Sequence, residues 1–313
     1  MKKITLLVLV AFGLFSCKDE PDDSPAPYPT DDLVLDERKN ALLIFPYGPG
    51  TTASVGFELY RKLMEDKHSD RLNHISLVAA MGHPLYAPAA DSLSANYGYP
   101  NLGTFILNGT EEELTNLDDQ IALTQLEKAG IYLKHKVSEF DTAWVVDVKV
   151  RFNVDTVSTN FLVETYMVAD VPAYNYIVEE LDLRMGELKD FIGISPARSF
   201  WVRPFDNLDT TKVIIKQNED YVHNNVLMRN FNSTNTFGTR LSELNPLGPE
   251  FFRGDVYGTR FTPIRHYFTK PKLDILALPY DFEPRFVTVI WYRDIFEDNY
   301  IYVNSYSDQE NDD

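Results

Sequence analysis

The pattern of hydrophobic residues changes at about residue 140, and this change divides the chain into two parts. Before it, short apolar runs alternate with segments whose apolar residues recur every three or four positions. That order predicts alternating strands and helices, and hence a mostly parallel, three-layer α/β sheet over residues 38–137. After it, Trp144 begins a strict alternation of apolar and polar residues. A period of two predicts a strand with one face in the core and the other in water.

The first part contains one run that is apolar at every position, residues 41–47, as in a strand buried on both faces. A glycine-rich turn and an amphipathic helix are expected directly after it. The remaining elements predicted before residue 140 are strands at 75–81 and 104–107 and helices at 87–97 and 111–133.

Five strand-forming segments separated by turn residues follow the alternating strand, at 161–168, 212–217, 221–228, 286–292 and 300–305. Helical patterns are rare there, apart from a candidate helix at 179–191. We therefore expect an antiparallel β-sandwich over residues 138–313. The predicted fold is α+β with two domains, a three-layer α/β domain followed by the sandwich.

Residues 1–16 are interpreted as a lipoprotein signal peptide. A positive start at Lys2 and Lys3 precedes an apolar core that ends just before Cys17. The core is too short to span a bilayer as a mature helix. Small or apolar residues directly before a cysteine resemble the lipobox of bacterial lipoproteins, which predicts an acylated Cys17 anchored in the outer membrane. A plain secretory signal with an incidental cysteine is the alternative.

Residues 17–37 are predicted to be a disordered tether, because acidic residues and prolines dominate the part that follows Cys17. An acidic run at this place resembles the signal that carries some lipoproteins to the cell surface. The formal charge of the chain is −18, and loss of Lys2 and Lys3 with the leader brings it to −20. Such a chain is repelled by phosphate backbones, so we expect no nucleic-acid partner.

The chain contains a single cysteine, Cys17. If this residue carries the lipid, the mature chain has no thiol for a disulfide, a nucleophile or a metal site. The six histidines show no metal-ligand spacing, and we expect no metal and no cofactor. A Gly-x-Ser-x-Gly elbow is absent as well, and Ser195 in Gly-Ile-Ser-Pro-Ala is its nearest approach. The sequence therefore predicts no catalytic residue.

The order of elements over residues 40–135 resembles the thioredoxin fold. Residues 43–52 occupy the place of the redox loop and hold no cysteine, while Pro100 matches the cis-proline that faces this loop. The resemblance thus implies a cis bond before Pro100 and a thioredoxin-like domain without oxidoreductase activity.

Several short segments are similar to the outer-membrane-protein-twenty-eight-related lipoproteins, a family with a thioredoxin-like half and a β-sandwich half. They are 83–86 (His-Pro-Leu-Tyr), 97–100 (Tyr-Gly-Tyr-Pro), 105–109 (Phe-Ile-Leu-Asn-Gly), 221–229 (Tyr-Val-His-Asn-Asn-Val-Leu-Met-Arg) and 237–238 (Phe-Gly). Members often retain a Cys-x-x-Cys in the first loop, and this chain departs from that pattern. The resemblance informs the fold more than the function.

One candidate ligand site follows from the thioredoxin resemblance, because that fold holds extended peptides beside its cis-proline. Its residues here are Tyr47, Gly50, Thr51, Thr52, Tyr99 and Pro100. Anion binding at the helix start and simple capping by Thr51 or Thr52 are alternatives. We expect a non-catalytic binding or assembly module for a protein, peptide or glycan. A hydrolase whose residues meet only in three dimensions, and a subunit of an outer-membrane complex, are the other hypotheses.

Overall fold

The computed structural model describes residues 27–46, 60–61, 63–78, 86–157, 159–178, 213–245, 248, 250–270 and 283–308. This part of the chain is mostly β-sheet with few helices and mixed strand directions, which is an α+β fold as predicted. The candidate helix at 179–191 lies outside the described residues.

The larger sheet has nine strands among the described residues. Eight of them follow the order β15-β14-β8-β9-β2-β1-β3-β4, and β10 pairs with β8. Their bounds are β1 (Ala41–Pro46), β2 (Leu72–Leu77), β3 (Phe105–Leu107), β4 (Thr110–Glu112), β8 (Phe161–Val178), β9 (Val213–Asn230), β10 (Thr239–Arg240), β14 (Pro284–Asp294) and β15 (Asn299–Ser307).

Strands from both predicted parts of the chain share this sheet. β2 runs parallel to β1 on one side and to β9 on the other, where Ser76 lies opposite Val226. The remaining pairs are antiparallel. The prediction of a mostly parallel sheet over residues 38–137 is therefore wrong, because β3 pairs antiparallel with both β1 and β4. β2 thus joins the edge of β9 at this pair of residues. The boundary at residues 137 and 138 therefore does not separate two sheets.

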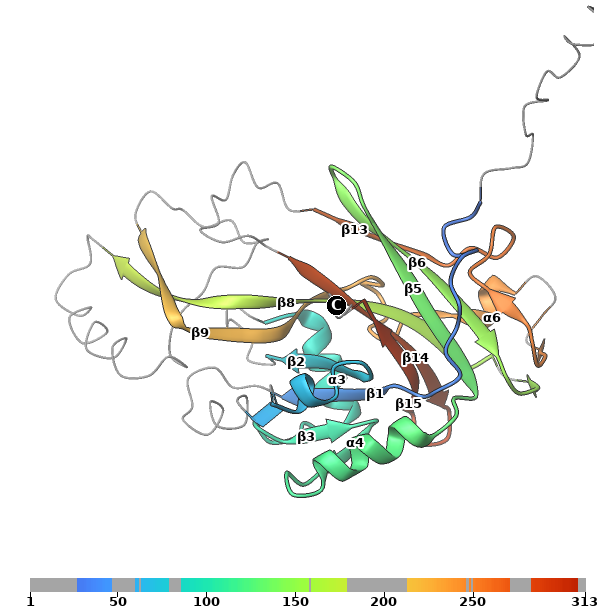
Figure 1. Ribbon diagram of the computed structural model, residues 1–313, viewed down its shortest axis with the longest axis horizontal. Coiled ribbons are helices and arrows are strands. Elements are labelled where there is room, and N and C mark those ends of the chain that lie inside the picture. The colour runs from blue at the N-terminus through green and yellow to red at the C-terminus, as the bar shows by residue number, and fades with distance from the viewer. Residues whose placement is uncertain are drawn as a thin grey trace, which may run out of the picture.

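A second sheet packs across β8, β14 and β15 (Figure 1). It consists of β5 (Ile131–Glu139), β6 (Ala143–Phe152), β12 (Val256–Tyr257) and β13 (Arg265–Thr269), with β6 in the middle. A short pair, β7 (Thr156–Val157) and β11 (Glu250–Phe251), forms a separate two-stranded sheet. The predicted alternation in β6 is confirmed, because its apolar residues lie in the core between the sheets: Trp144, Val146, Val148, Val150 and Phe152.

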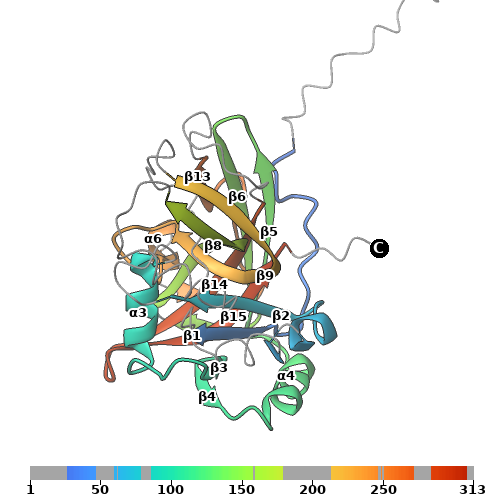
Figure 2. The same ribbon diagram turned by 90° about the vertical axis from the view of Figure 1, so that its left-hand side faces the viewer.

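Helices cover both faces of β1, which explains why its run is apolar throughout. α3 (Pro88–Asn96) packs on the face of Leu42 and Ile44. α4 (Leu117–Leu126) packs with Ala41, Leu43 and Phe45 on the other face (Figure 2). A short α6 (Leu241–Leu244) follows β10. No helix in the described part of the chain is long and apolar enough to cross a bilayer.

Three predicted elements differ in the structure. The helix expected at 111–133 is shortened to α4, because residues 110–112 form a hairpin with β3 and residues from Ile131 onward belong to β5. Asn108 and Gly109 both have positive φ, 53° and 91°, as a tight hairpin turn requires. The strands expected at 212–217 and 221–228 form a single strand, β9, with register shifts against β8.

The outer face of β6 is covered by the start of the described chain, so it is not fully in water as predicted. Lys149 donates from Nζ to the carbonyls of Thr30 and Leu33, both at 2.9 Å. Thr30 in turn donates to the carbonyl of Gly258. Asp147 is buried beneath this segment and accepts a 2.6 Å bond from Arg265 Nε. Within the range expected to be a tether, the residues from Tyr28 on therefore lie against the body.

Gly238 is expected to tolerate no side chain. A Cβ there would lie 2.0 Å from the carbonyl oxygen of Val163, and the φ of Gly238 is +99°. Gly254 is a matched control, with a φ of +98° and nothing within 4 Å. Both alanine variants carry backbone strain of about 1–3 kcal/mol. Gly238→Ala should lose about 1–3 kcal/mol more because of the clash. Urea unfolding followed by circular dichroism measures the difference, and equal losses would contradict it.

Candidate functional site

The predicted peptide groove can be placed only in part. Tyr99 is 69% exposed and Pro100 is half-buried, on the turn between α3 and β3. The prediction of a cis bond before Pro100 is wrong, because the bond is trans; the turn is made instead by positive φ at Gly98 and Tyr99. The other groove residues, Tyr47, Gly50, Thr51 and Thr52, lie outside the described residues, as does Cys17.

A buried polar cluster lies between β2 and the helical residues 60–61 and 63–67. Glu65 Oε2 accepts a 2.8 Å bond from Arg61 Nη1, which lies 3.1 Å from His74 Nδ1. His74 Nε2 lies 3.1 Å from Ser76 Oγ, and Asn225 donates to Glu65 from β9. A serine, a histidine and a carboxylate thus converge, as in a hydrolase.

The hydrogen-bond partners of His74 favour a proton order that does not activate the serine, although Glu65 Oε2 also lies 3.9 Å from His74 Nδ1. A guanidinium only donates, so His74 accepts at Nδ1 and carries its proton on Nε2. That proton is donated to Ser76, whose hydroxyl donates to the carbonyl of Asn224 at 2.9 Å. Burial and the nearby Arg61 lower the pKa of His74 to about 4. His74 therefore has no free lone pair facing Ser76 that could take its proton.

A second buried chain of polar side chains joins the two sheets. His135 Nδ1 lies 2.8 Å from Thr288 Oγ1, which lies 2.9 Å from Thr165 Oγ1, which lies 2.7 Å from His266 Nδ1. The four residues come from β5, β14, β8 and β13, and each is at most 3% exposed.

The chain of three hydrogen bonds links the tautomers of the two histidines. Three hydrogen bonds need three protons, and each threonine hydroxyl donates one. The third proton must therefore come from Nδ1 of one imidazole, and the other imidazole accepts a hydrogen bond at its Nδ1. Burial, with a contribution from His135, lowers the pKa of His266 to about 3. Phe231 stacks on the His266 ring at a centroid distance of 4.2 Å. The chain therefore links the two sheets; among the described residues, His135 Nε2 at its end has no hydrogen-bond partner and lies 3.9 Å from Asp308 Oδ1.

Glu164 is a buried carboxylate at the edge of the same core. Its oxygens accept backbone N–H bonds from Thr165, Phe231 and Asn232 at 2.7 to 3.2 Å. Burial raises its pKa to about 8 although these bonds oppose the shift. Glu164 thus fixes the turn after β9. In the residues that the structure describes, no group of three or more histidine, cysteine or acidic side chains is placed to hold a metal ion.

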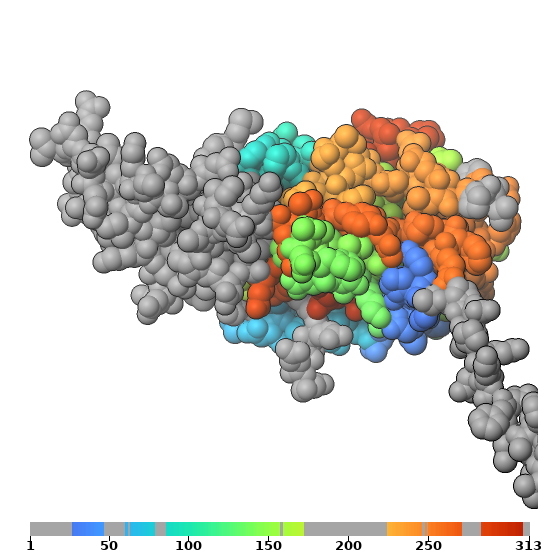
Figure 3. All heavy atoms as spheres, turned by 90° about the horizontal axis from the view of Figure 1, so that it is seen from above, coloured from blue at the N-terminus to red at the C-terminus, as the bar shows by residue number. Residues whose placement is uncertain are grey.

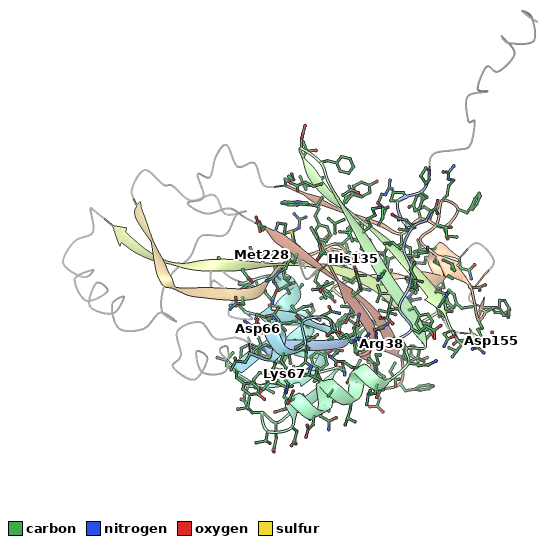
Figure 4. The ribbon with its side chains drawn as sticks, in the orientation of Figure 1. Arg38, Asp66, Lys67, His135, Asp155 and Met228 are labelled. Carbon is green, nitrogen blue, oxygen red and sulfur yellow. The ribbon has the colours of Figure 1, made fainter. Side chains whose placement is uncertain are left out.

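Two surface pockets in the described part of the chain, each of about 240 Å³, present side chains that can meet a ligand. The first, here called the polar pocket, is formed where β2, β5 and β15 meet. It is lined by Asp36, Arg38, Asn40, Ser69, Asp70, Asn73, Leu133, Lys134, Tyr306 and Ser307. Arg38 is labelled in Figure 4.

The polar pocket has a fixed floor and a charged rim. Arg71 is buried beneath it and holds Asp36 and Asp70 at 3.3 Å each. Asn73 donates to Ser305 Oγ at 2.7 Å. Lys134 Nζ lies 5.8 Å from the centroid of the Tyr306 ring. Acceptors, donors and one aromatic ring suit a polar ligand such as a peptide or a glycan. Sequence reasoning missed this site because its residues come from four distant segments.

The second pocket, here called the end pocket, lies at one end of the second sheet. It is lined by Asn245, Glu250, Phe252, Asp255, Val256, Tyr257 and Thr262. Burial, aided by the charge of Asp255, raises the pKa of Tyr257 to about 12, so the phenol stays neutral and can donate. Two aromatic rings beside two carboxylates suit a cationic group.

Fold and sites together define an α+β protein with buried, closed polar clusters and open polar pockets. No protein-family model and no curated protein matches the chain. Among solved structures, HBP35 of Porphyromonas gingivalis aligns with a TM-score of 0.56 and 10% identity, over 88% of this chain and 77% of that one. Protein AGR_C_4864 from Agrobacterium tumefaciens aligns with a TM-score of 0.41 and 10% identity, over 87% and 95%. HBP35 therefore shares the fold, and the likeness extends no further.

The raised pKa of Glu164 predicts a stability that falls as pH rises. The folded state holds this proton up to about pH 8, whereas the unfolded chain releases it near 4.5. The stabilisation is therefore complete below 4.5 and lost by about pH 8, with a slope of up to about 1.4 kcal/mol per pH unit. Protonation of His74 and His266 changes the free energy of unfolding only below about pH 6.5. The pH dependence expected from Glu164 is therefore measured between pH 6.5 and 8.

Urea unfolding across that window should show the slope in the wild type and in the exposed control Glu243→Gln, but not in Glu164→Gln. The same slope in all three proteins would mean that Glu164 is already ionised in the folded state.

Proposed function

We propose that this protein is an outer-membrane lipoprotein, anchored through Cys17, that acts as a non-catalytic binding or assembly module. The observation that carries the proposal is the polar pocket, an open site with a rigid floor and side chains suited to hydrogen bonding. Its ligand is a peptide, a protein segment or a glycan. The groove predicted around Tyr99 and Pro100 stays a second candidate for the same role.

The hydrolase hypothesis is less well supported by the geometry. The Ser76, His74 and Glu65 set has the composition of a hydrolase site, but its serine and histidine are buried and its proton order is reversed. A nucleophile needs a neighbouring base with a free lone pair, and His74 uses that lone pair to accept from Arg61. The cluster is better explained as a support for β2.

We propose further that residues 38–137 are a thioredoxin-like unit of the outer-membrane-protein-twenty-eight-related type, followed by a β-sandwich. The strand order β2-β1-β3-β4, with helices on both faces of β1, supports the first unit. The packing of β6 and β13 on β8 and β14 supports the second. Two features depart from the thioredoxin pattern, the trans bond before Pro100 and the absence of a redox dithiol. The two proposed units are joined by the pairing of β2 with β9.

The proposed anchor at Cys17 is close in sequence to Tyr28, a residue whose place on the body is known. Tyr28 is held on the outer face of the second sheet, with the Arg265 guanidinium 5.6 Å from its ring centroid. The eleven residue steps from Cys17 to Tyr28 span at most about 40 Å when fully extended. An acylated Cys17 would therefore keep this end of the body near the membrane.

Cys17→Ala should abolish acylation and move the protein from the membrane fraction to the soluble fraction. Loss of the acyl chains removes the only lipid attachment that the sequence predicts. Fractionation with immunoblotting measures the change, and the control is Ser16→Ala, which keeps the cysteine. If Cys17→Ala stays in the membrane fraction, the anchor proposal is wrong.

The acidic run after Cys17 should decide which side of the outer membrane the body faces. Wild-type protein is expected to be cleaved by protease added to intact cells. A variant with Asp19, Glu20, Asp22 and Asp23 changed to Asn or Gln is expected to be protected until the outer membrane is broken. Protection of the wild type would place the body in the periplasm.

Single changes in the polar pocket should weaken binding without unfolding the protein. Asp70→Ala and Lys134→Ala each remove a charged partner at the rim, and each should weaken binding about 10-fold. Wild type and variants are compared on peptide and glycan arrays, followed by calorimetry on the strongest probe. Lys67→Ala is the control, an exposed lysine that pairs with Asp118 outside the pocket. Equal binding by all four proteins would remove the polar pocket as the ligand site.

A further inference from the structure

Two loops at one end of the second sheet expose phenylalanine side chains to solvent. Phe261, between β12 and β13, is 90% exposed, and Phe252, between β11 and β12, is 56% exposed. Each is next to an arginine in the sequence, Arg260 and Arg253. We call residues 252–255 and 258–264 the tip loops; the end pocket lies between them.

The tip loops lie beside the point where the chain leaves the body toward Cys17. Thr30 donates to the carbonyl of Gly258 in the second tip loop. Arg265, which directly follows this loop, stacks on Tyr28. Figure 3 shows the first described residues, in blue, against the orange surface of residues 250–265. Asp155, which binds the backbone of Arg253, marks the same end in Figure 4.

We propose that the tip loops insert Phe261 and Phe252 into the headgroup region of the membrane to which the chain is tethered. The inference rests on the proposed anchor, which brings this end of the body within about 40 Å of the bilayer. Exposed aromatic side chains flanked by arginines are suited to the boundary between headgroups and acyl chains. The proposed anchor holds the chain at the membrane, and a small apolar contact at a second point would hold the body in one orientation.

The charges around the loops favour a zwitterionic lipid over an anionic one. Arg253 is exposed and can pair with a lipid phosphate. Glu250 and Asp255 line the end pocket beside Phe252 and Tyr257, where they suit the ammonium of an ethanolamine headgroup. A chain of charge −18 is also repelled by a strongly anionic surface. The partner inferred is therefore a bilayer rich in phosphatidylethanolamine.

The turn between β14 and β15 provides a matched control on another side of the molecule. Phe296 in this turn is 91% exposed, as much as Phe261. Figures 1, 2 and 3 all place the β14–β15 turn away from the first described residues. If exposure alone led to membrane contact, Phe261 and Phe296 would both contact the membrane. If the tip loops dock, only Phe261 contacts it.

The test attaches a fluorescent probe either at position 261 or at position 296. Both labelled proteins are the whole mature chain. Residues 18–313 contain no cysteine, so Phe261→Cys and Phe296→Cys each create a single labelling site. An amino-terminal decahistidine tag replaces Cys17 and tethers the chain to phosphatidylethanolamine and phosphatidylcholine vesicles that carry nickel-chelating lipid. The label is an environment-sensitive nitrobenzoxadiazole, and circular dichroism checks that both labelled proteins are folded.

The expected result is a blue shift and at least about a two-fold rise in emission at position 261, with quenching by nitroxide-labelled lipid, and neither change at position 296. Equal signals at the two positions, no change at 261, or a change only when phosphatidylglycerol replaces phosphatidylethanolamine would each overturn the proposal. Since the histidine tag supplies the tether, this outcome is independent of acylation. Failure of the anchor proposal is detected separately, by the fractionation of Cys17→Ala.

Discussion

The pairing of β2 with β9 is the interaction on which the rest of the structure depends. It joins four strands from the first part of the chain to the strands of the second, so that one sheet passes through the whole body. β2 pairs with the edge of β9 at Ser76 and Val226, and so continues the sheet from one part of the chain into the other. Its consequence is that both parts share cores on either side of one sheet, and the polar pocket forms where they meet.

The placement of polar groups separates what supports the fold from what can meet a ligand. His74, His135, His266 and Glu164 are buried side chains. Each of the three histidines has a hydrogen-bond partner inside the protein. Buried polar groups are tolerated only when such partners satisfy them, and this makes the network a specific link between elements. The pockets differ, because their carboxylates, amides and aromatic rings line surface hollows. Recognition is therefore better supported than catalysis.

The segment from Tyr28 to Leu33 connects the proposed anchor with the orientation of the body. Hydrogen bonds from Lys149 and to Gly258 hold it on the second sheet, and this fixes the end of the molecule from which the tether starts. A tether that began from a mobile segment would leave the orientation open. Here the tip loops, the end pocket and the segment from Tyr28 to Leu33 lie together at one end of the second sheet.

The sequence by itself determined the α+β class, most strands, the alternation in β6 and the doubly buried β1, because these follow from local periodicity. It did not determine the length of α4, the single strand β9 or the trans bond before Pro100, since pairing with distant strands and turn geometry decide these. Nor did it reveal the polar pocket, whose Asp36, Asp70, Lys134 and Tyr306 are far apart along the chain. Only the tertiary structure brings these residues together, because the pairing of β2 with β9 is a long-range contact that no local pattern encodes.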